Sequence, residues 1–226
     1  MAEINTYSEE IRQMRDAAGF TTQIFEENFP GKYGDISDFL LNVSGQETLY
    51  GTMNNRLYDD GTPISITEFQ IDPIRFLDML ERSKTGDAYK RIEMINETFT
   101  NLGYQDFDIR NIATVVENQS IDPITGEKNI DYRYSDINKQ YLDDPYITTT
   151  LARHIIANTE ELIPSDLAGQ ATYWKTHWNT EEGSGTEEEF MNKKEVYINP
   201  TNVEDDVMDL LREQDEDPFK IQPAEE

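Results

Sequence analysis

The chain has 226 residues and a mass of 26.2 kDa, enough for one domain of about 150 to 200 residues with short extensions. Its formal net charge of −27 argues against direct binding to nucleic acid, because such binding neutralises phosphates. The lack of cysteine excludes disulfides, and the lack of any long apolar run excludes a membrane span. Aromatic residues make up 11% of the chain, so a packed core can form.

The first apolar pattern with helical spacing covers residues 7–29. Gly19 divides this pattern, which therefore predicts either one helix or two, and Pro30 with Gly31 ends it. We expect residues 1–34 to form a helical extension that packs on its own domain.

Residues 35–47 predict a helix that ends in a carboxylate. Asp35 is an N-cap candidate, and apolar residues follow it at spacings of three and four. Glu47 would lie at the C-terminal end, where the negative end of the helix dipole favours the protonated carboxyl. Burial would add to this effect, and a proton-donating carboxyl needs such an environment.

A polar connection of about twenty residues follows Glu47 and predicts an irregular loop or a short hairpin. It leads to Phe69-Gln70-Ile71 and then to Asp72-Pro73, an N-cap and a first-turn proline that predict the next helix. Glu68, beside Phe69, is expected to face solvent. The order along the chain is therefore helix, Glu47, loop, Phe-Gln-Ile, helix.

In the middle of the chain the spacing of apolar residues changes from a helical to an alternating pattern. Residues 87–102 predict a helix that stops at Gly103, and residues 106–116 predict a further one. Alternating apolar residues on both sides of a turn at Asp122-Pro123 predict a β-hairpin over residues 113–134. This hairpin either lines a substrate cleft or is a surface excursion.

Two further helices are expected. Asp144-Pro145 starts one that ends at Pro164, with its apolar stripe reaching Leu162, and it is the candidate buried central helix. Ser165 is expected to cap the second helix. This helix carries four large aromatic rings, which either contact substrate or pack in the core. These rings belong to Tyr173, Trp174, His177 and Trp178.

Metal and cofactor binding are not expected. His154 and His177 are the two histidines, and without cysteine they offer few ligands, so we expect both to be structural. The chain has no glycine pattern of the kind that binds phosphate.

The C-terminal part is acidic. Thr186 and Glu189 form a capping box for a short helix. Residues 196–226 are expected to hold an acidic helix and a disordered tail, which either solvates the protein or docks on a partner.

Three short segments follow one another along the chain: Glu47-Thr48, then Ser65 with Phe69-Gln70-Ile71, then residues 171–180. The order resembles the lytic transglycosylase and goose-type lysozyme branch of the lysozyme superfamily. In that branch a helix ends in the catalytic Glu, and a Ser-rich and Gly-rich stretch leads to an aromatic residue or Met, then Gln. The third segment most resembles peptidoglycan-cleaving proteins carried in bacteriophage particles.

The resemblance implies a fold and a reaction. The fold is mainly α (α+β), with a lysozyme-like helical domain over residues 35–195 and a small β-hairpin. Glu47 would be the catalytic acid and base that cleaves the β-1,4 bond between N-acetylmuramic acid and N-acetylglucosamine and leaves a 1,6-anhydro ring. The implied substrate-binding residues are Ser65, Phe69, Gln70, Tyr173, Trp178 and Asn179.

A hydrolytic muramidase is the second choice, because hydrolysis by the common route uses two carboxylates. The available second carboxylates are Asp59, Asp60 and Asp72.

The resemblance also implies partners and a location. These are peptidoglycan glycan strands and other virion structural proteins. With no leader sequence, the chain would be made in the host cytoplasm, carried in the virion, and active in the host periplasm or cell wall during cell entry.

The alternative is a non-enzymatic phage structural protein, an internal core or tail component, with a degenerate lysozyme-like fold. Thr48 stands where the family usually has Ser, and no glycine lies between Ser65 and Phe69. An acidic mimic of nucleic acid is a third interpretation, which a Glu-loop-Gln site does not favour.

Overall fold

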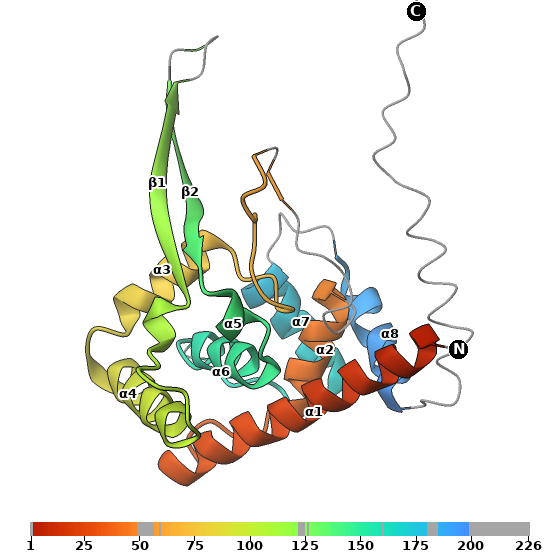
Figure 1. The fold of residues 1–226 in the computed structure, drawn as a ribbon. Coiled ribbons are helices and arrows are strands. Elements are labelled where there is room, and N and C mark those ends of the chain that lie inside the picture. The colour runs from red at the N-terminus through yellow and green to blue at the C-terminus, as the bar shows by residue number, and fades with distance from the viewer. Residues whose placement is uncertain are drawn as a thin grey trace, which may run out of the picture.

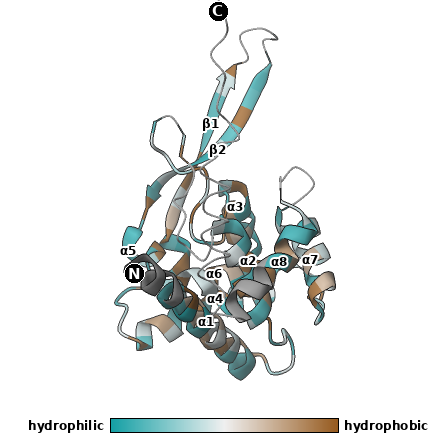
Figure 2. Ribbon diagram, turned by 90° about the vertical axis from the view of Figure 1, so that its right-hand side faces the viewer, coloured by the Kyte–Doolittle hydropathy of each residue, from teal (hydrophilic) through white to brown (hydrophobic). Residues whose placement is uncertain are grey.

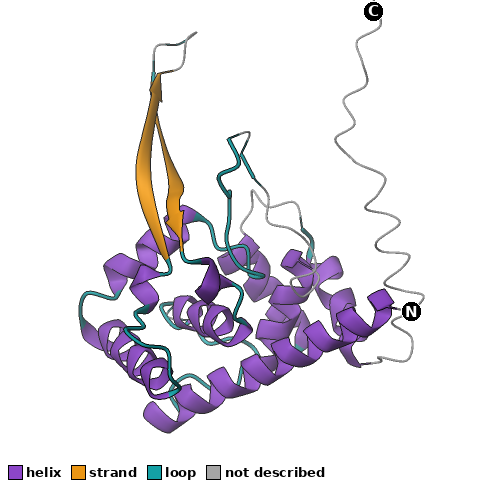
Figure 3. Ribbon diagram, viewed as in Figure 1, coloured by secondary structure: helices purple, strands orange, loops and turns teal. Residues whose placement is uncertain are grey.

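A computed structural model gives a mostly helical chain with one two-stranded antiparallel sheet, which confirms the expected α+β class (Figure 1, Figure 3). No helix in the described ranges is both long and apolar enough to cross a bilayer. The described residues are 2–48, 57–58, 60–121, 125, 127–159, 161–179 and 185–198.

The N-terminal segment forms a single helix, α1 (Ala2–Asn28), which continues through Gly19 without interruption. It runs along the helical body and packs against α2 (Ser37–Thr48) and α6 (Pro145–Ile156) (Figure 1). Its buried face reaches the common core through the side chains of Ile11, Met14, Ala18, Ile24 and Phe25.

Predicted capping residues lie at or next to one end of each of three helices. Asp35 accepts a hydrogen bond of 2.9 Å from the amide of Ser37, at the start of α2. Asp72 caps α3 (Pro73–Arg82) by accepting a hydrogen bond of 2.8 Å from the amide of Arg75. Next, α4 (Gly86–Asn101) ends just before Gly103, whose φ of 101° is easily adopted only by glycine.

The predicted helix over residues 106–116 is wrong. Only the short η1 (Ile109–Asn111) forms there, and β1 (Ala113–Ile121) begins directly after it. The β-branched residues at 114–116 pair with β2 (Lys128–Ile137), and this pairing outweighs any helical tendency.

The hairpin itself is confirmed, and it extends slightly further than expected. Its strands pair in antiparallel register from Ala113 opposite Ile137 to Ile121 opposite Lys128, with one irregularity next to Thr114. The hairpin stands away from the helical body (Figure 1).

The buried central helix is confirmed as α6, which follows the short α5 (Lys139–Leu142). However, α6 ends at Ile156, well before Pro164. The chain leaves the helix there because the hydroxyl of Thr159 donates a hydrogen bond of 2.8 Å to the carbonyl of Ile156. Leu162 therefore leaves the helical stripe and is 81% exposed.

The last described helices are α7 (Leu167–Trp174), which continues as the π-helical η2 (Lys175–Asn179), and α8 (Glu187–Ile198). Asp166 caps α7 in place of the expected Ser165, because its Oδ1 accepts from the amide of Gly169. The Thr186 and Glu189 capping box of α8 is confirmed. The expected acidic helix beyond residue 198 lies outside the described residues.

Candidate functional site

Glu47 lies in the last turn of α2, half-buried. Its Oε1 accepts a hydrogen bond of 3.0 Å from Nε1 of Trp174, the last residue of α7. Trp174 is 1% exposed and stacks on Phe190 of α8, with ring centroids 5.1 Å apart. A fixed ring therefore holds the carboxylate at the place where α2 ends.

The residue after Glu47 joins α2 to the loop that precedes α3. The hydroxyl of Thr48 donates a hydrogen bond of 2.9 Å to the carbonyl of Glu68. The loop is closed by two backbone hydrogen bonds between Ile66 and Ile71, of 2.8 and 2.9 Å. This arrangement fixes the loop beside the end of α2.

Two residues of this loop, Thr67 and Gln70, have positive φ angles of 67° and 50°. Side chains other than glycine rarely adopt this conformation, and it is found mostly where the surrounding structure fixes it. Gln70 is further fixed by Ser65, whose hydroxyl hydrogen-bonds to its Oε1 at 2.5 Å. Ser65 is buried and Gln70 is half-buried, so the amide of Gln70 is the more accessible group.

Phe69 and Trp178 pack together under a cation. Nε1 of Trp178 donates to the carbonyl of Phe69 at 3.1 Å, and their rings meet edge to face. Arg75 of α3 places its guanidinium 4.5 Å from the Trp178 ring and donates to the Trp178 carbonyl. Phe69 is fully buried and Trp178 nearly so, so both rings contribute mainly to the core that supports the site.

Arg75 also influences Glu47. Burial lowers the pKa of Arg75, whereas the charges of Asp72 and Glu47 act in the opposite direction. The Arg75 guanidinium is therefore a charged neighbour of the carboxylate. The sequence offers no sign of this role, because it depends on the position of α3 against η2.

Asn179 is connected to the surroundings of Glu47 by a hydrogen bond to Gly185, whose backbone lies against Trp174. Nδ2 of Asn179 donates to the carbonyl of Gly185 at 3.0 Å. A Cβ atom on Gly185 would lie 2.6 Å from Cη2 of Trp174 and 3.2 Å from Nε2 of Gln46. The backbone at Gly185 is thus packed on the ring that holds Glu47.

Tyr173 is the expected site residue that does not join this group. Its hydroxyl hydrogen-bonds to Thr159 at 2.5 Å, and its ring lies against Phe39 and His177. Tyr173 is 6% exposed. The neighbouring ring, Trp174, is the one that contacts Glu47, because adjacent residues of a helix point in different directions.

The expectation that Glu68 faces solvent is wrong. Its Oε1 accepts a hydrogen bond from the hydroxyl of Thr148 on α6. Burial raises the pKa of the Glu68 carboxyl to about 7, opposed by the Thr148 hydrogen bond and aided by the charge of Asp144. The left-handed turn at Thr67 directs this side chain inward, which alternation along an extended strand does not anticipate.

Both histidines have neighbours that explain them without a metal. His154 is fully buried and lies between Ser83 and Arg91, and burial together with the Arg91 charge lowers its pKa to about 3. His177 contacts Glu161 at 3.1 Å. Across the described ranges, no three His, Cys, Asp or Glu side chains form a group that could hold a metal.

Comparisons with protein families, with characterised proteins and with solved structures give no match to this chain.

Proposed function

We propose that the protein is a peptidoglycan lytic transglycosylase that cleaves the β-1,4 bond between N-acetylmuramic acid and N-acetylglucosamine. The observation that carries this proposal is the hydrogen bond from Trp174 to Glu47, which orients one carboxylate at the end of a helix. The order of Glu47, the Ser65 to Gln70 loop and α3 resembles the lytic transglycosylase and goose-type lysozyme branch, and the mostly helical α+β class agrees with the fold that this resemblance implies.

In this mechanism Glu47 acts twice. It first protonates the glycosidic oxygen as the bond to C1 of the muramic acid residue breaks. The carboxylate then takes the proton from the C6 hydroxyl of that residue, whose oxygen bonds to C1 and closes a 1,6-anhydro ring. One residue therefore serves as acid and then as base, with no water consumed.

The surroundings of Glu47 suit both steps. Its position at the C-terminal end of α2 favours the protonated form, which the first step needs. The indole N–H of Trp174 and the charge of Arg75 favour the carboxylate form, which the second step needs.

The other carboxylates support the route with one carboxylate over hydrolysis. Asp72 is occupied as the N-cap of α3. Asp60 lies at the surface, where it pairs with Arg133 at 3.4 Å. Asp59 lies outside the described residues. A water-activating second carboxylate for a muramidase is therefore not provided by Asp72 or Asp60.

We further propose that the protein is carried in a phage virion, contacts other virion proteins and acts on the host wall during cell entry. A non-enzymatic structural role in the particle is the second candidate. The β1–β2 hairpin favours it, because it projects from the body and its mainly hydrophilic strands include some hydrophobic residues (Figure 2), three of which are exposed. The exposed large apolar side chains of the hairpin are Val116, Ile121 and Ile130.

Digestion of purified peptidoglycan tests the proposal. Wild-type protein, Glu47→Gln and the control Glu27→Gln would be compared, with mass spectrometry of the released muropeptides. Glu27 is an exposed residue of α1, so its substitution makes the same charge change away from the site. Anhydro-muropeptides from wild type and Glu27→Gln, but not from Glu47→Gln, are the expected result.

Other outcomes have distinct meanings. Products with reducing ends that disappear in Glu47→Gln would replace the transglycosylase by a muramidase. No products from any of the three proteins, with all three folded, would overturn the enzymatic proposal and leave the structural role.

A further inference from the structure

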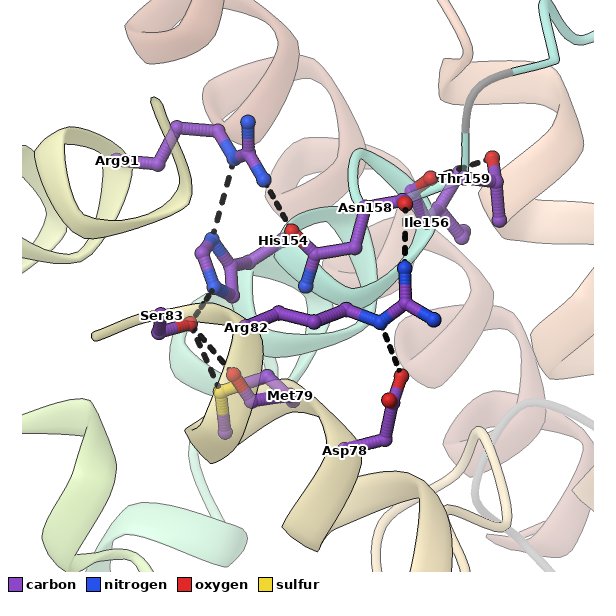
Figure 4. A network of polar contacts seen from close by, with 9 residues as sticks. All are labelled: Asp78, Met79, Arg82, Ser83, Arg91, His154, Ile156, Asn158 and Thr159. Atoms are coloured by element: carbon purple, nitrogen blue, oxygen red, sulfur yellow. Dashed lines mark hydrogen bonds and ion pairs between the residues drawn. The ribbon is translucent and has the colours of Figure 1, made fainter. Parts of the chain in front are cut away.

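A cavity of about 520 Å³ opens at the end of α6 that is remote from Glu68. Its walls come from the connection between α1 and α2, the end of α3, the first turns of α4 and the segment that follows α6. Figure 4 shows part of this wall, where Arg82 and Arg91 approach Asn158 from two different helices. A volume of this size is typical of small-ligand sites.

Four basic side chains and two acidic ones, Asp87 and Glu161, line this cavity, although the protein has a net charge of −27. Two of the basic side chains lie at the rim and have acidic partners: Lys32 pairs with Asp87, and Arg82 pairs with Asp78. The other two, Arg91 and Arg153, are 3% and 2% exposed.

The two buried arginines are bonded to uncharged groups. Arg91 donates to the hydroxyl of Tyr33 at 2.6 Å, to Nδ1 of His154 at 3.4 Å, and to Asn158. Arg153 donates to the carbonyls of Tyr33 and Gly34 at 2.9 and 3.0 Å. His154 adds no charge, because burial and Arg91 lower its pKa to about 3.

Compensation for these two charges is incomplete. Among the described residues, no carboxylate lies within 4.0 Å of either guanidinium, and the buried Nε of Arg153 has no partner. Burial and the charge of Arg91 lower the pKa of Arg153 to about 10, while Asp35 acts in the opposite direction. The Arg153 guanidinium therefore remains charged at neutral pH.

The ring of Tyr33 offers partial compensation. Its centroid lies 5.2 Å from the Arg91 guanidinium and 5.7 Å from that of Arg153. A cation over a ring gains less than a buried charge without a counter-ion costs. An anion in the cavity would supply what the protein itself does not.

We propose that this cavity binds a small organic dianion, with its oxyanion groups at the cluster of Arg91, Arg153, Lys32 and Arg82. Two adjacent buried cations favour a doubly charged ligand, and carboxylates and phosphates both fit guanidinium donors. The apolar side chains of Ile156 and Ile163 line the remaining wall and suit a short carbon skeleton. This inference is independent of the proposed wall-cleaving activity.

Calorimetric titration of the full chain with succinate, and separately with inorganic phosphate, tests the proposal at pH 7.5 and constant ionic strength. Wild type would be compared with the rim variant Lys32→Gln/Arg82→Gln and with the control Arg12→Gln. Arg12 is an exposed residue near the other end of α1. We expect saturable binding to wild type and Arg12→Gln, weakened at least tenfold in the rim variant.

The two anions distinguish the ligand chemistry. Tighter succinate binding would identify a dicarboxylate, and tighter phosphate binding would identify a phosphorylated compound. In wild type, the side-chain Nε–H signals of Arg91 and Arg153 should shift on titration, whereas that of Arg12 should not. No saturable binding of either anion, or equal weakening in Arg12→Gln, would overturn the site.

Discussion

The indole Nε1 of Trp174 donates a hydrogen bond of 3.0 Å to Oε1 of Glu47, and so joins two helix ends that are 127 residues apart in sequence. Replacing Trp174 by Phe keeps an aromatic ring on Phe190 but removes the donor. Hydrogen bonds to charged groups are worth about 1.5 to 3 kcal/mol, so we expect kcat to fall roughly 10- to 100-fold. Release of muropeptides over time measures this, and full activity would contradict the role of the bond.

Gly185 should tolerate no side chain. In Gly185→Ala the new Cβ would meet the Trp174 ring at 2.6 Å, and that ring is held by Phe190. We expect a loss of about 1 to 3 kcal/mol in the free energy of unfolding, from denaturant titration. Gly19→Ala is the matched control, since nothing lies within 4 Å of its Cβ position in α1. It should be neutral or stabilising by up to about 1 kcal/mol.

Thr48 should contribute through its hydroxyl. Thr48→Val keeps the shape but leaves the carbonyl of Glu68 without this donor, which costs about 1 to 3 kcal/mol when the group is buried. Thr48→Ser keeps the hydroxyl and should recover most of the loss. Thermal unfolding of the three proteins compares them, and a loss in Thr48→Ser with none in Thr48→Val would assign the effect to the methyl group instead.

Glu68 should make stability depend on pH. Its pKa is raised from 4.5 to about 7 in the folded protein, so between these values the folded state binds more protons than the unfolded chain. Its contribution therefore favours folding below pH 4.5 and is lost as the pH rises through about 7. The full effect is on the order of 3 kcal/mol.

The variant Glu68→Gln isolates this effect, because its amide oxygen can still accept from Thr148. Relative to wild type it should gain stability from pH 5 to pH 8, as measured by denaturant titration across this range. Glu97→Gln, on the exposed face of α4, serves as the control for charge alone. A constant difference between Glu68→Gln and wild type at all pH values would contradict a titrating buried carboxyl.

Local signals account for what the sequence predicts well. Asp72 and Asp144, each followed by proline, begin α3 and α6 because capping depends only on neighbouring residues. The alternating pattern of β1 and β2 likewise gives the hairpin. Such features need no knowledge of how distant parts of the chain meet.

Tertiary contacts account for what the sequence does not predict. The positions of Glu68 against Thr148 and of Arg75 against Trp178 depend on how separate helices pack. The end of α6 is also missed, because a hydroxyl at Thr159 competes with the helix after Ile156. The candidate Glu47 follows from its sequence position, whereas its partner Trp174 follows only from the fold.

The hairpin has a consequence for amide hydrogen exchange. Within the described chain β1 and β2 form a sheet of their own, so each strand has one edge paired and one edge open. In an antiparallel pair, successive N–H groups point alternately toward the partner strand and away from it. Deuterium uptake should therefore alternate residue by residue along both strands, with protected amides next to fast-exchanging ones from Val115 onward.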